Sequence, residues 1–409
     1  MSTPRGVALV IAALISGSVL SGCSTSSGSG STAGAPAPTG TPATALTLPA
    51  LVPTTTAPAT ATPTPTPSAT SAPTTAPPAV AFSAGNPNGH ASIPSAAQAV
   101  DTAHPTRKIG TGTPAGCTSA AVVAAVAAGG IITFNCGPNP IVITMQATAK
   151  VVNAHPQIVL DGGGKVTLSG AGSRRILYMN TCDQAQGWTS SHCQDQSTPE
   201  LTVQNLTFEY GNSTGQTAFG GGGGAIFASG GRLKVVNSKF VSNRCDSTGP
   251  DLGGAAIRAF EQYDNLPVYI VDSTFGGAPG QGGICSNGGA LSSIGVSWVV
   301  INSVMTYNSA IGNGANPARS GTPGGGSGGA IYTDGNAYTV TVEDSIIEHN
   351  VANEGGGALF FVSNDKTGTL AIQGSTLSDN VSKGFSTAGY PGIFFLGSGS
   401  PSVKGSSLH

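Results

Sequence analysis

A glycine-containing motif that recurs through the second half of the chain constrains the fold more than any other feature. In each copy one or two glycines lead into a short apolar segment centred on Ile or Leu. The copies are Gly223-Gly224-Ala225-Ile226-Phe227, Gly253-Gly254-Ala255-Ala256-Ile257-Arg258, Gly288-Gly289-Ala290-Leu291-Ser292, Gly328-Gly329-Ala330-Ile331-Tyr332, Gly356-Gly357-Ala358-Leu359-Phe360 and, degenerate, Pro391-Gly392-Ile393-Phe394. The residues before each Ile or Leu are 225, 256, 290, 330, 358 and 392, so the spacings are 31, 34, 40, 28 and 34 residues. A period near thirty residues with variable insertions indicates a solenoid.

A second motif alternates with the first and completes the repeat. It runs through Val203–Phe208, Val235–Phe240, Ile270–Phe275, Val300–Met305, Val342–Ile347 and Ile372–Leu377, with an Asn, Asp or Gly at its third position. Asn243, Asn308, Asn350 and Asn380 each follow three residues after the last apolar position.

Three short strands per thirty-residue turn predict a right-handed parallel β-helix, whose equivalent strands pair about 4.8 Å apart. Asparagines at the corners are then expected to form side-chain ladders along the stack. A β-propeller is the rival fold, but its blades need four strands within about 40–50 residues, and the shortest spacing here is 28.

A short helix is expected before the first coil. Thr118 or Ser119 is placed to cap an Ala/Val-rich helix that runs to about Ala128 and ends at Gly129-Gly130. A helix at this position covers the open end of a solenoid. We therefore expect residues 116–409 to form one all-β domain, a right-handed parallel β-helix with a short N-terminal capping helix.

The N-terminus indicates export. A basic start and an apolar run from Val7 to Leu20, too short to span a bilayer, are typical of a signal peptide over residues 1–22. Leu20-Ser21-Gly22-Cys23 resembles the lipobox of bacterial lipoproteins, which implies diacylglycerol on Cys23; the alternative is an ordinary signal peptide with an unrelated cysteine. The expected partner is the cell membrane, reached from its extracytoplasmic side through this lipid anchor. Residues 23–115 are rich in Pro, Thr, Ser and Ala and are expected to form a disordered tether.

Charge and cysteine content narrow the chemistry. Charged residues make up 8% of the chain and the formal net charge is −2, which argues against nucleic acid as a partner. Six of the seven cysteines remain after Cys23, and an exported protein is expected to pair them. Sequence proximity favours Cys117–Cys136 and Cys182–Cys193, and the shared corner of adjacent coils favours Cys245–Cys285, although six cysteines allow fifteen connectivities. No Cys-x-x-Cys spacing is present, so we expect no metal site.

The Gly-Gly-Ala-Ile segments together with Phe240-x-x-Asn243 resemble the repeats of chlamydial polymorphic outer-membrane proteins. More broadly, residues 200–395 are similar to the pectin-lyase-like β-helix superfamily. Met305, Ile347 and Leu377 replace the aromatic residue of the second repeat motif, and no β-barrel segment follows, so autotransport is not implied. The superfamily includes calcium-dependent lyases and glycosidases with paired aspartates. The resemblance implies calcium only if the chain is a lyase, and otherwise no cofactor.

Local signatures of these enzymes, such as Asn-Thr-Asp, Asp-Asp and Gly-His-Gly, are absent. The densest polar segment lies around one coil and supplies the catalytic candidates Asp251, Arg258 and Glu261, with Asp334 two coils later. Side chains from neighbouring coils are able to converge as a general base and its partners. The alternative is that they are solvated surface charges.

The residue after each inward Ile or Leu is expected to face outward, because side chains alternate along a strand. This column holds Phe227, Arg258, Ser292, Tyr332, Phe360 and Phe394. Exposed aromatic rings with an arginine suit a sugar polymer, so Phe227, Arg258, Tyr332, Phe360 and Phe394 are the predicted ligand-binding residues. The alternative is that the coil geometry is reversed or that loops cover the rings as packing. All insertions fall at one edge of the solenoid, and such loops often form the binding face. The expected function is non-catalytic binding of a polysaccharide or surface protein; the alternative is a polysaccharide lyase or glycoside hydrolase.

Overall fold

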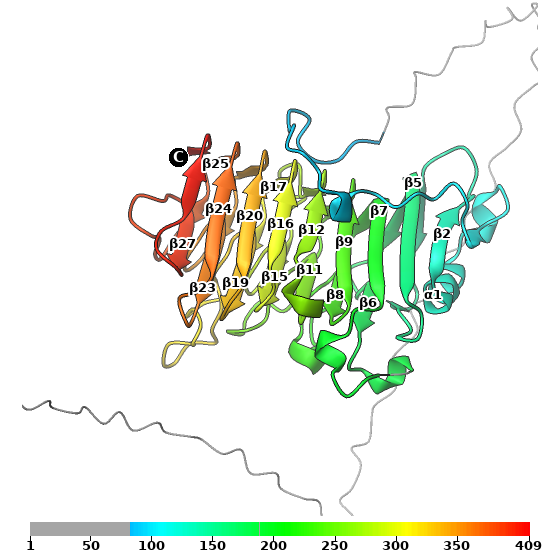
Figure 1. The fold of residues 1–409 in the computed structure, drawn as a ribbon, viewed down its shortest axis with the longest axis horizontal. Helices are drawn as coiled ribbons and strands as arrows, with labels where there is room; N and C mark the ends of the chain where they lie inside the picture. Colours follow the sequence, from blue (N-terminus) through cyan, green and yellow to red (C-terminus); the bar gives the residue numbers. More distant parts are fainter. Residues whose placement is uncertain (1–81, 188) are drawn as a thin grey trace, which may run out of the picture. The chain divides into compact units, whose positions relative to one another are not determined.

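The structure is a computed structural model that describes residues 82–187 and 189–409, and these residues form a parallel β-helix (Figure 1). The predicted signal peptide, the lipidation site Cys23 and the tether as far as residue 81 lie outside the described residues. Every pairing between the strands is parallel, and equivalent strands of successive coils stand side by side along the stack.

Three parallel sheets make up the stack. The largest has 17 strands: β1 (Arg107–Ile109), β2 (Gly130–Phe134), β3 (Ile141–Thr144), β5 (Gln157–Ser169), β7 (Glu200–Glu209), β9 (Arg232–Val236), β10 (Lys239–Val241), β12 (Val268–Val271), β13 (Thr274–Phe275), β16 (Trp298–Ile301), β17 (Val304–Thr306), β20 (Thr339–Glu343), β21 (Ile346–Glu348), β24 (Thr369–Gln373), β25 (Thr376–Ser378), β28 (Ser402–Lys404) and β29 (Ser407–Leu408). Its strands β5 and β7 continue around a corner, which joins two faces of the helix into one sheet.

The second sheet has eight strands and contains the glycine-led segments. It runs through β4 (Ala149–Lys150), β6 (Leu177–Asn180), β8 (Ile226–Ser229), β11 (Ile257–Phe260), β15 (Leu291–Ile294), β19 (Ile331–Gly335), β23 (Leu359–Ser363) and β27 (Ile393–Leu396). The third, unpredicted sheet has four very short strands: β14 (Ile284–Cys285), β18 (Ser309–Ala310), β22 (Val351–Ala352) and β26 (Val381–Ser382).

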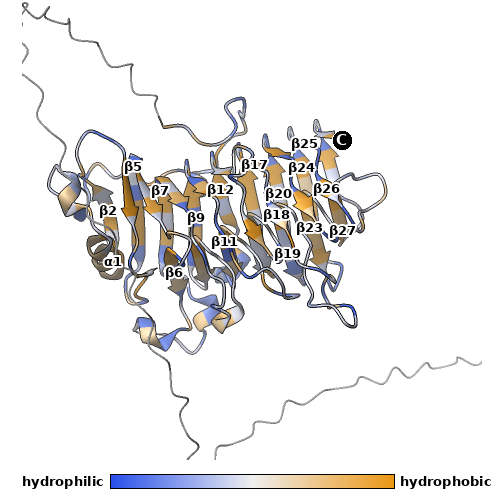
Figure 2. Ribbon diagram, turned by 180° about the vertical axis from the view of Figure 1, so that it is seen from behind, coloured by the Kyte–Doolittle hydropathy of each residue, from blue (hydrophilic) through white to orange (hydrophobic). Residues whose placement is uncertain are grey.

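The sequence alignment of the coils is confirmed by the strand register. Ile226 pairs with Ile257, which pairs with Leu291, and the same column continues through Ile331, Leu359 and Ile393. These side chains belong to one continuous apolar core that runs the length of the stack. Figure 2 shows hydrophobic residues concentrated along the strands and hydrophilic residues in the loops.

Polar ladders hold the corners, as the sequence predicted. The Asn308 side chain donates to Asn350 and the Asn350 side chain donates to Asn380, each at 2.9 Å. At the other corner Asn205, Asn237, Asp272, Asn302 and Asp344 all adopt positive φ between 42° and 52°, the conformation in which a short polar side chain bonds locally. Repetition of the same turn thus fixes the register of every coil.

The capping helix is confirmed. Helix α1 spans Ser119–Ala128, the Thr118 hydroxyl accepts a hydrogen bond from the Ala121 amide, and Gly129 ends the helix at a φ of 66°. Val122 and Val126 are buried in the core at the end of the stack. Short 3-10 turns lie at η1 (Ser95–Ala97), η2 (Pro114–Gly116), η3 (Gln184–Gln186), η4 (Cys193–Asp195), η5 (Ala218–Gly220) and η6 (Tyr263–Asn265). None of the helices in the described ranges has the length and apolar character to cross a bilayer.

Residues ahead of the expected domain start at 116 also pack against the β-helix. Residues 84–102 run along the outside of the largest sheet as a strap, and β1 then pairs with β2. The strap is held at its start by the Asn86 amide on the Asn302 carbonyl, 2.7 Å, and at its end by the Thr102 hydroxyl on Asp161, 2.7 Å. It also covers Val236, Val271 and Ile301 with Ala97. The sequence of the strap is polar and loop-like. It did not reveal these contacts, because the residues that the strap bonds to lie in the sheet, far away along the chain.

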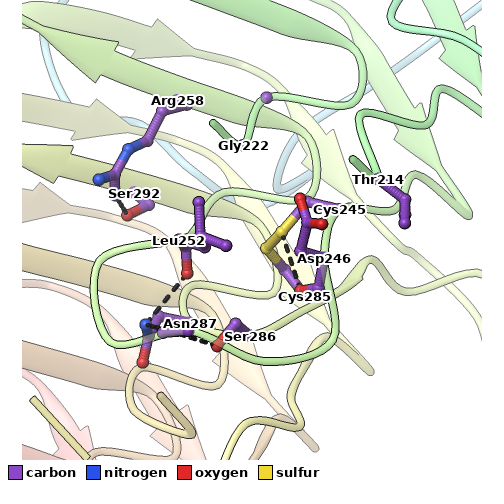
Figure 3. Close-up of a disulfide and its surroundings, with 12 residues drawn as sticks. Thr214, Gly222, Cys245, Asp246, Leu252, Arg258, Cys285, Ser286, Asn287 and Ser292 are labelled. Carbon is purple, nitrogen blue, oxygen red and sulfur yellow. Dashed lines mark hydrogen bonds between the residues drawn. A yellow bond between two sulfur atoms is a disulfide. The ribbon is translucent and has the colours of Figure 1, made fainter. Parts of the chain in front are cut away.

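The three predicted disulfides are present: Cys117–Cys136, Cys182–Cys193 and Cys245–Cys285. Figure 3 shows the third of these beside Arg258 and Ser292, at the edge where the long insertions leave the coils.

Candidate functional site

The outward column of the eight-stranded sheet lies where the sequence placed it, but most of it is covered. Phe227 pairs with Arg258, and the register continues through Ser292, Tyr332, Phe360 and Phe394. Its members lie outside the apolar core formed by the Ile and Leu column. Yet the exposed fractions of Phe227, Arg258 and Tyr332 are 0% and that of Phe360 is 3%. The prediction of an exposed aromatic column is therefore wrong for these four residues, and Phe394 is half-buried.

The insertions explain the burial, because they fold back over the column. The Arg258 guanidinium donates to the Asp251 carbonyl at 2.5 Å, and Asn316 donates to the Tyr332 hydroxyl at 2.9 Å. Phe385, from a third insertion, packs edge-on against Phe394 with ring centroids 4.8 Å apart. The structure therefore agrees with the alternative interpretation, in which loops pack over these rings.

Arg258 is a buried cation at the centre of the column. Its guanidinium also donates to the Ser292 hydroxyl (Figure 3) and lies 4.4 Å from the centre of the Phe260 ring. Burial lowers the pKa of Arg258 to about 10, opposed by the nearby Tyr332, Asp251 and Asp334. The residue thus ties one coil to the next and to the loop that covers it.

Three of the four catalytic candidates meet here. The Asn316 amide donates to Asp251 at 2.7 Å and to Asp334 at 3.1 Å, so one side chain joins the two carboxylates. Asp251 is exposed and Asp334 is half-buried. Glu261 lies apart: it is exposed just beyond β11 and makes no side-chain hydrogen bond to this cluster among the described residues.

An open pocket lies at the other end of the same sheet, where the column continues past the residues that sequence analysis identified. Tyr178 pairs with Phe227, and Lys150 pairs with Tyr178. Lys150, Arg175, Tyr178, Asp183 and Phe219 line the pocket, whose volume is about 430 Å³. The Ile176-Leu177-Tyr178 segment repeats the apolar-apolar-aromatic pattern of Ala225-Ile226-Phe227, but without the glycine pair that marked the later coils.

The walls of this pocket are rigidly held. Arg175 is 5% exposed, and its Nε and Nη2 donate to the carbonyls of Gly223 and Gly222 at 3.0 and 2.7 Å. Its guanidinium carbon lies 4.9 Å from the centre of the Phe227 ring. Burial lowers the pKa of Arg175 to about 10. The Tyr178 hydroxyl donates to Asp183 at 3.0 Å, and burial raises the pKa of that hydroxyl.

Phe219, on the loop between β7 and β8, also lines the pocket. Its side chain is 55% exposed, which is unusual for so large an apolar group, and its φ is 58°. Its exposed ring is therefore accessible to a ligand in the pocket.

Two other features carry less chemistry. A larger groove of about 730 Å³ lies between α1 and β3, but no charged side chain lines it. Across residues 82–187 and 189–409, no three His, Cys, Asp or Glu side chains gather closely enough to hold a metal ion.

No family model, curated protein or solved structure matches this chain, so the candidate site rests on its own geometry.

Proposed function

We propose that this chain is a lipid-anchored protein of the extracytoplasmic membrane surface that binds a polysaccharide without transforming it. Lipidation at Cys23 would hold it to the membrane, and the β-helix would carry the binding site. The resemblance of its repeats to those of chlamydial outer-membrane proteins and of pectin-lyase-like proteins is part of this proposal and agrees with a role at a cell surface.

The observation that carries the proposal is the open pocket beside Phe219. Sugar rings have flat apolar faces that pack on aromatic rings, and their hydroxyls need polar partners close by. Phe219 provides an exposed ring, while Lys150 and Asp183 provide charged groups on the same pocket wall. A pocket of about 430 Å³ falls within the usual range for small-ligand sites.

A glycan-binding measurement on the full chain tests this function. We expect Phe219→Ala to weaken polysaccharide binding about tenfold, because the exposed ring is lost without disturbing the core. Leu396→Ala is the matched control: it removes an exposed apolar side chain, 39% exposed, from the opposite end of the same sheet. Absence of binding across neutral and charged glycans, or equal binding by both variants, would refute the proposal.

A second function is favoured by one observation, the convergence of Asp251 and Asp334 on Asn316. A pair of carboxyl groups is what a glycoside hydrolase needs, with one acting as acid and the other as nucleophile or base, and Asn316 bonds to both of these. Against it, Asn316 and the loops already occupy the space between the two groups. Release of reducing ends from a polysaccharide, abolished by Asp251→Asn and by Asp334→Asn, would establish hydrolysis in place of simple binding.

A further inference from the structure

The groove between α1 and β3 is bordered by a strand edge that no other strand covers. Within the described ranges β3 pairs with β5 and with no second strand. The Met145 amide, just after β3, donates to the Ser169 carbonyl at 2.8 Å. Because the bonds of a parallel ladder alternate along the strand, the N–H and C=O groups of Val142 and Thr144 point away from β5. Both residues line the groove, so their backbone groups are open to a partner there.

The β3 edge also lacks the charges that protect the other strand edges at this end of the stack. β1 and β4, which begin the two neighbouring columns of strands, carry the exposed Lys108 and Lys150. β3 reads Ile-Val-Ile-Thr, holds no charge, and leaves Val142 56% exposed. Lysine on an edge strand discourages the addition of a further strand, and β3 has none.

The opposite wall of the groove is an apolar face of α1. Four residues spaced along one side of the helix line the groove: Ala120, Val123, Ala124 and Ala127. Ala120 and Ala124 are exposed. A unit that caps a solenoid normally turns a polar face outward, and a helix that is apolar all round is normally covered. This face of α1 therefore has the character of an interface.

We infer that the groove binds an extended, uncharged peptide segment of another protein, which adds to β3 as a further strand. Its backbone bonds the open groups of Val142 and Thr144, and its apolar side chains pack on the alanine face of α1. An unpaired strand edge selects an extended backbone, which presents N–H and C=O groups at matching intervals. No charged side chain lines the groove, so a charged segment would be desolvated without a partner. The groove belongs to a different sheet from the pocket beside Phe219, so this inference is independent of glycan binding.

The test uses a labelled synthetic peptide, Lys-Gly-Val-Thr-Val-Thr-Val-Gly-Lys, with N-methyl groups on both threonine amides. These groups block one edge of the peptide and prevent its stacking on itself, while the valine edge stays free. A control peptide carries N-methyl groups on the valine amides as well, so it keeps the side chains and has no bonding edge. Fluorescence anisotropy with the full chain should show the first peptide bound at least about tenfold more tightly than the control.

Ala124→Glu should weaken binding of the first peptide about tenfold or more, because it places a charge in the groove. Position 124 is exposed and Glu is a good helix former, so this variant is expected to fold. Ala99→Glu, at an exposed position of the strap, is the matched control and should bind as wild type does. Phe219→Ala should also bind the peptide normally, which separates this result from the glycan measurement.

Equal binding of the two peptides, equal binding by the Ala124→Glu and Ala99→Glu variants, or no peptide binding would overturn the inference. Sedimentation of the chain without peptide covers the other occupant. A dimer that Ala124→Glu dissociates, together with absence of peptide binding, would assign the groove to a second copy of the chain in place of a peptide strand.

Discussion

The outward column of the eight-stranded sheet has two regions that are built on the same strand register but differ in what covers them. Around Arg258 and Tyr332 the column lies under the insertions, and its polar groups bond to those loops. Around Lys150 and Tyr178 the column opens into a pocket. The repeat places side chains in line along the stack, and the insertions determine which of them meet solvent.

This difference separates two roles for identical strand positions. In the covered middle, aromatic rings and a buried arginine brace one coil against the next: Tyr332 and Phe360 stack with centroids 5.0 Å apart. At the open end, Lys150 occupies the same column and is exposed, while the buried Tyr178 lines the pocket beside it. The following predictions test whether the middle contributes stability and the open end contributes binding.

The largest effect is expected from the disulfides. Removing Cys245–Cys285, whose cysteines lie 40 residues apart, should lower the free energy of unfolding by about 4 kcal/mol, since the loop it closes is long. Removing Cys182–Cys193, which closes an 11-residue loop near the open pocket, should cost about 3 kcal/mol. Denaturant midpoints of the double Cys→Ser variants give the comparison. A smaller loss for the longer loop would argue against a bracing role for the covered edge.

Arg258→Ala should come next, with a loss of about 3 kcal/mol in unfolding free energy. The change removes a fully buried side chain and leaves the Ser292 hydroxyl and the Asp251 carbonyl without their donor. Arg244→Ala, at an exposed position in the insertion between β10 and β11, should change stability by less than about 0.5 kcal/mol. Similar denaturation midpoints for the two variants would show that Arg258 does not brace the coils.

Phe219→Ala should have the opposite effect to Arg258→Ala: a small loss of stability and a large loss of glycan binding. Because the ring is largely exposed and its backbone conformation is strained, the loss of stability should stay below about 0.5 kcal/mol while glycan affinity falls about tenfold. Thermal unfolding and binding of the same sample measure both quantities. A large loss of stability would mean that Phe219 packs as the middle rings do.

The smallest effect concerns pH and the loop that covers the middle. Arg319 donates two hydrogen bonds to Glu354, and this pairing lowers the pKa of the Glu354 carboxyl below its ordinary value. The resulting stabilisation is complete above the ordinary glutamate pKa and is lost as pH falls through the lower pKa of the folded state. Glu354→Gln should therefore show a shallower loss of stability on acidification. Superimposable acid-denaturation profiles for wild type and variant would contradict this.

Much of the fold could be predicted from the repeat. The glycine-led segments gave the strand register, the corner residues Asn308 and Asn350 gave a ladder, and Thr118 with Gly129 gave the bounds of α1. These are local patterns that each coil repeats, so the sequence displays them directly.

The strap and the state of the candidate site could not be predicted in the same way. The strap residue Asn86 bonds Asn302 across more than two hundred positions, and Asn316 reaches Tyr332 from a loop with no repeat of its own. The pocket was missed because the coils around Lys150 and Tyr178 lack the glycine pair on which the alignment was built. Burial of a repeating column depends on insertions that do not repeat.

Footprinting of the bound glycan tests the central claim most directly. The full chain, mixed with the glycan that binds most tightly, would be oxidised by hydroxyl radicals and compared with the unbound chain. Protection of the exposed Phe219, with no change at Leu252 of the covering loop or at Leu396, is the predicted result. Protection confined to Leu252 or Leu396, with Phe219 unchanged, would contradict the assignment of binding to the open end.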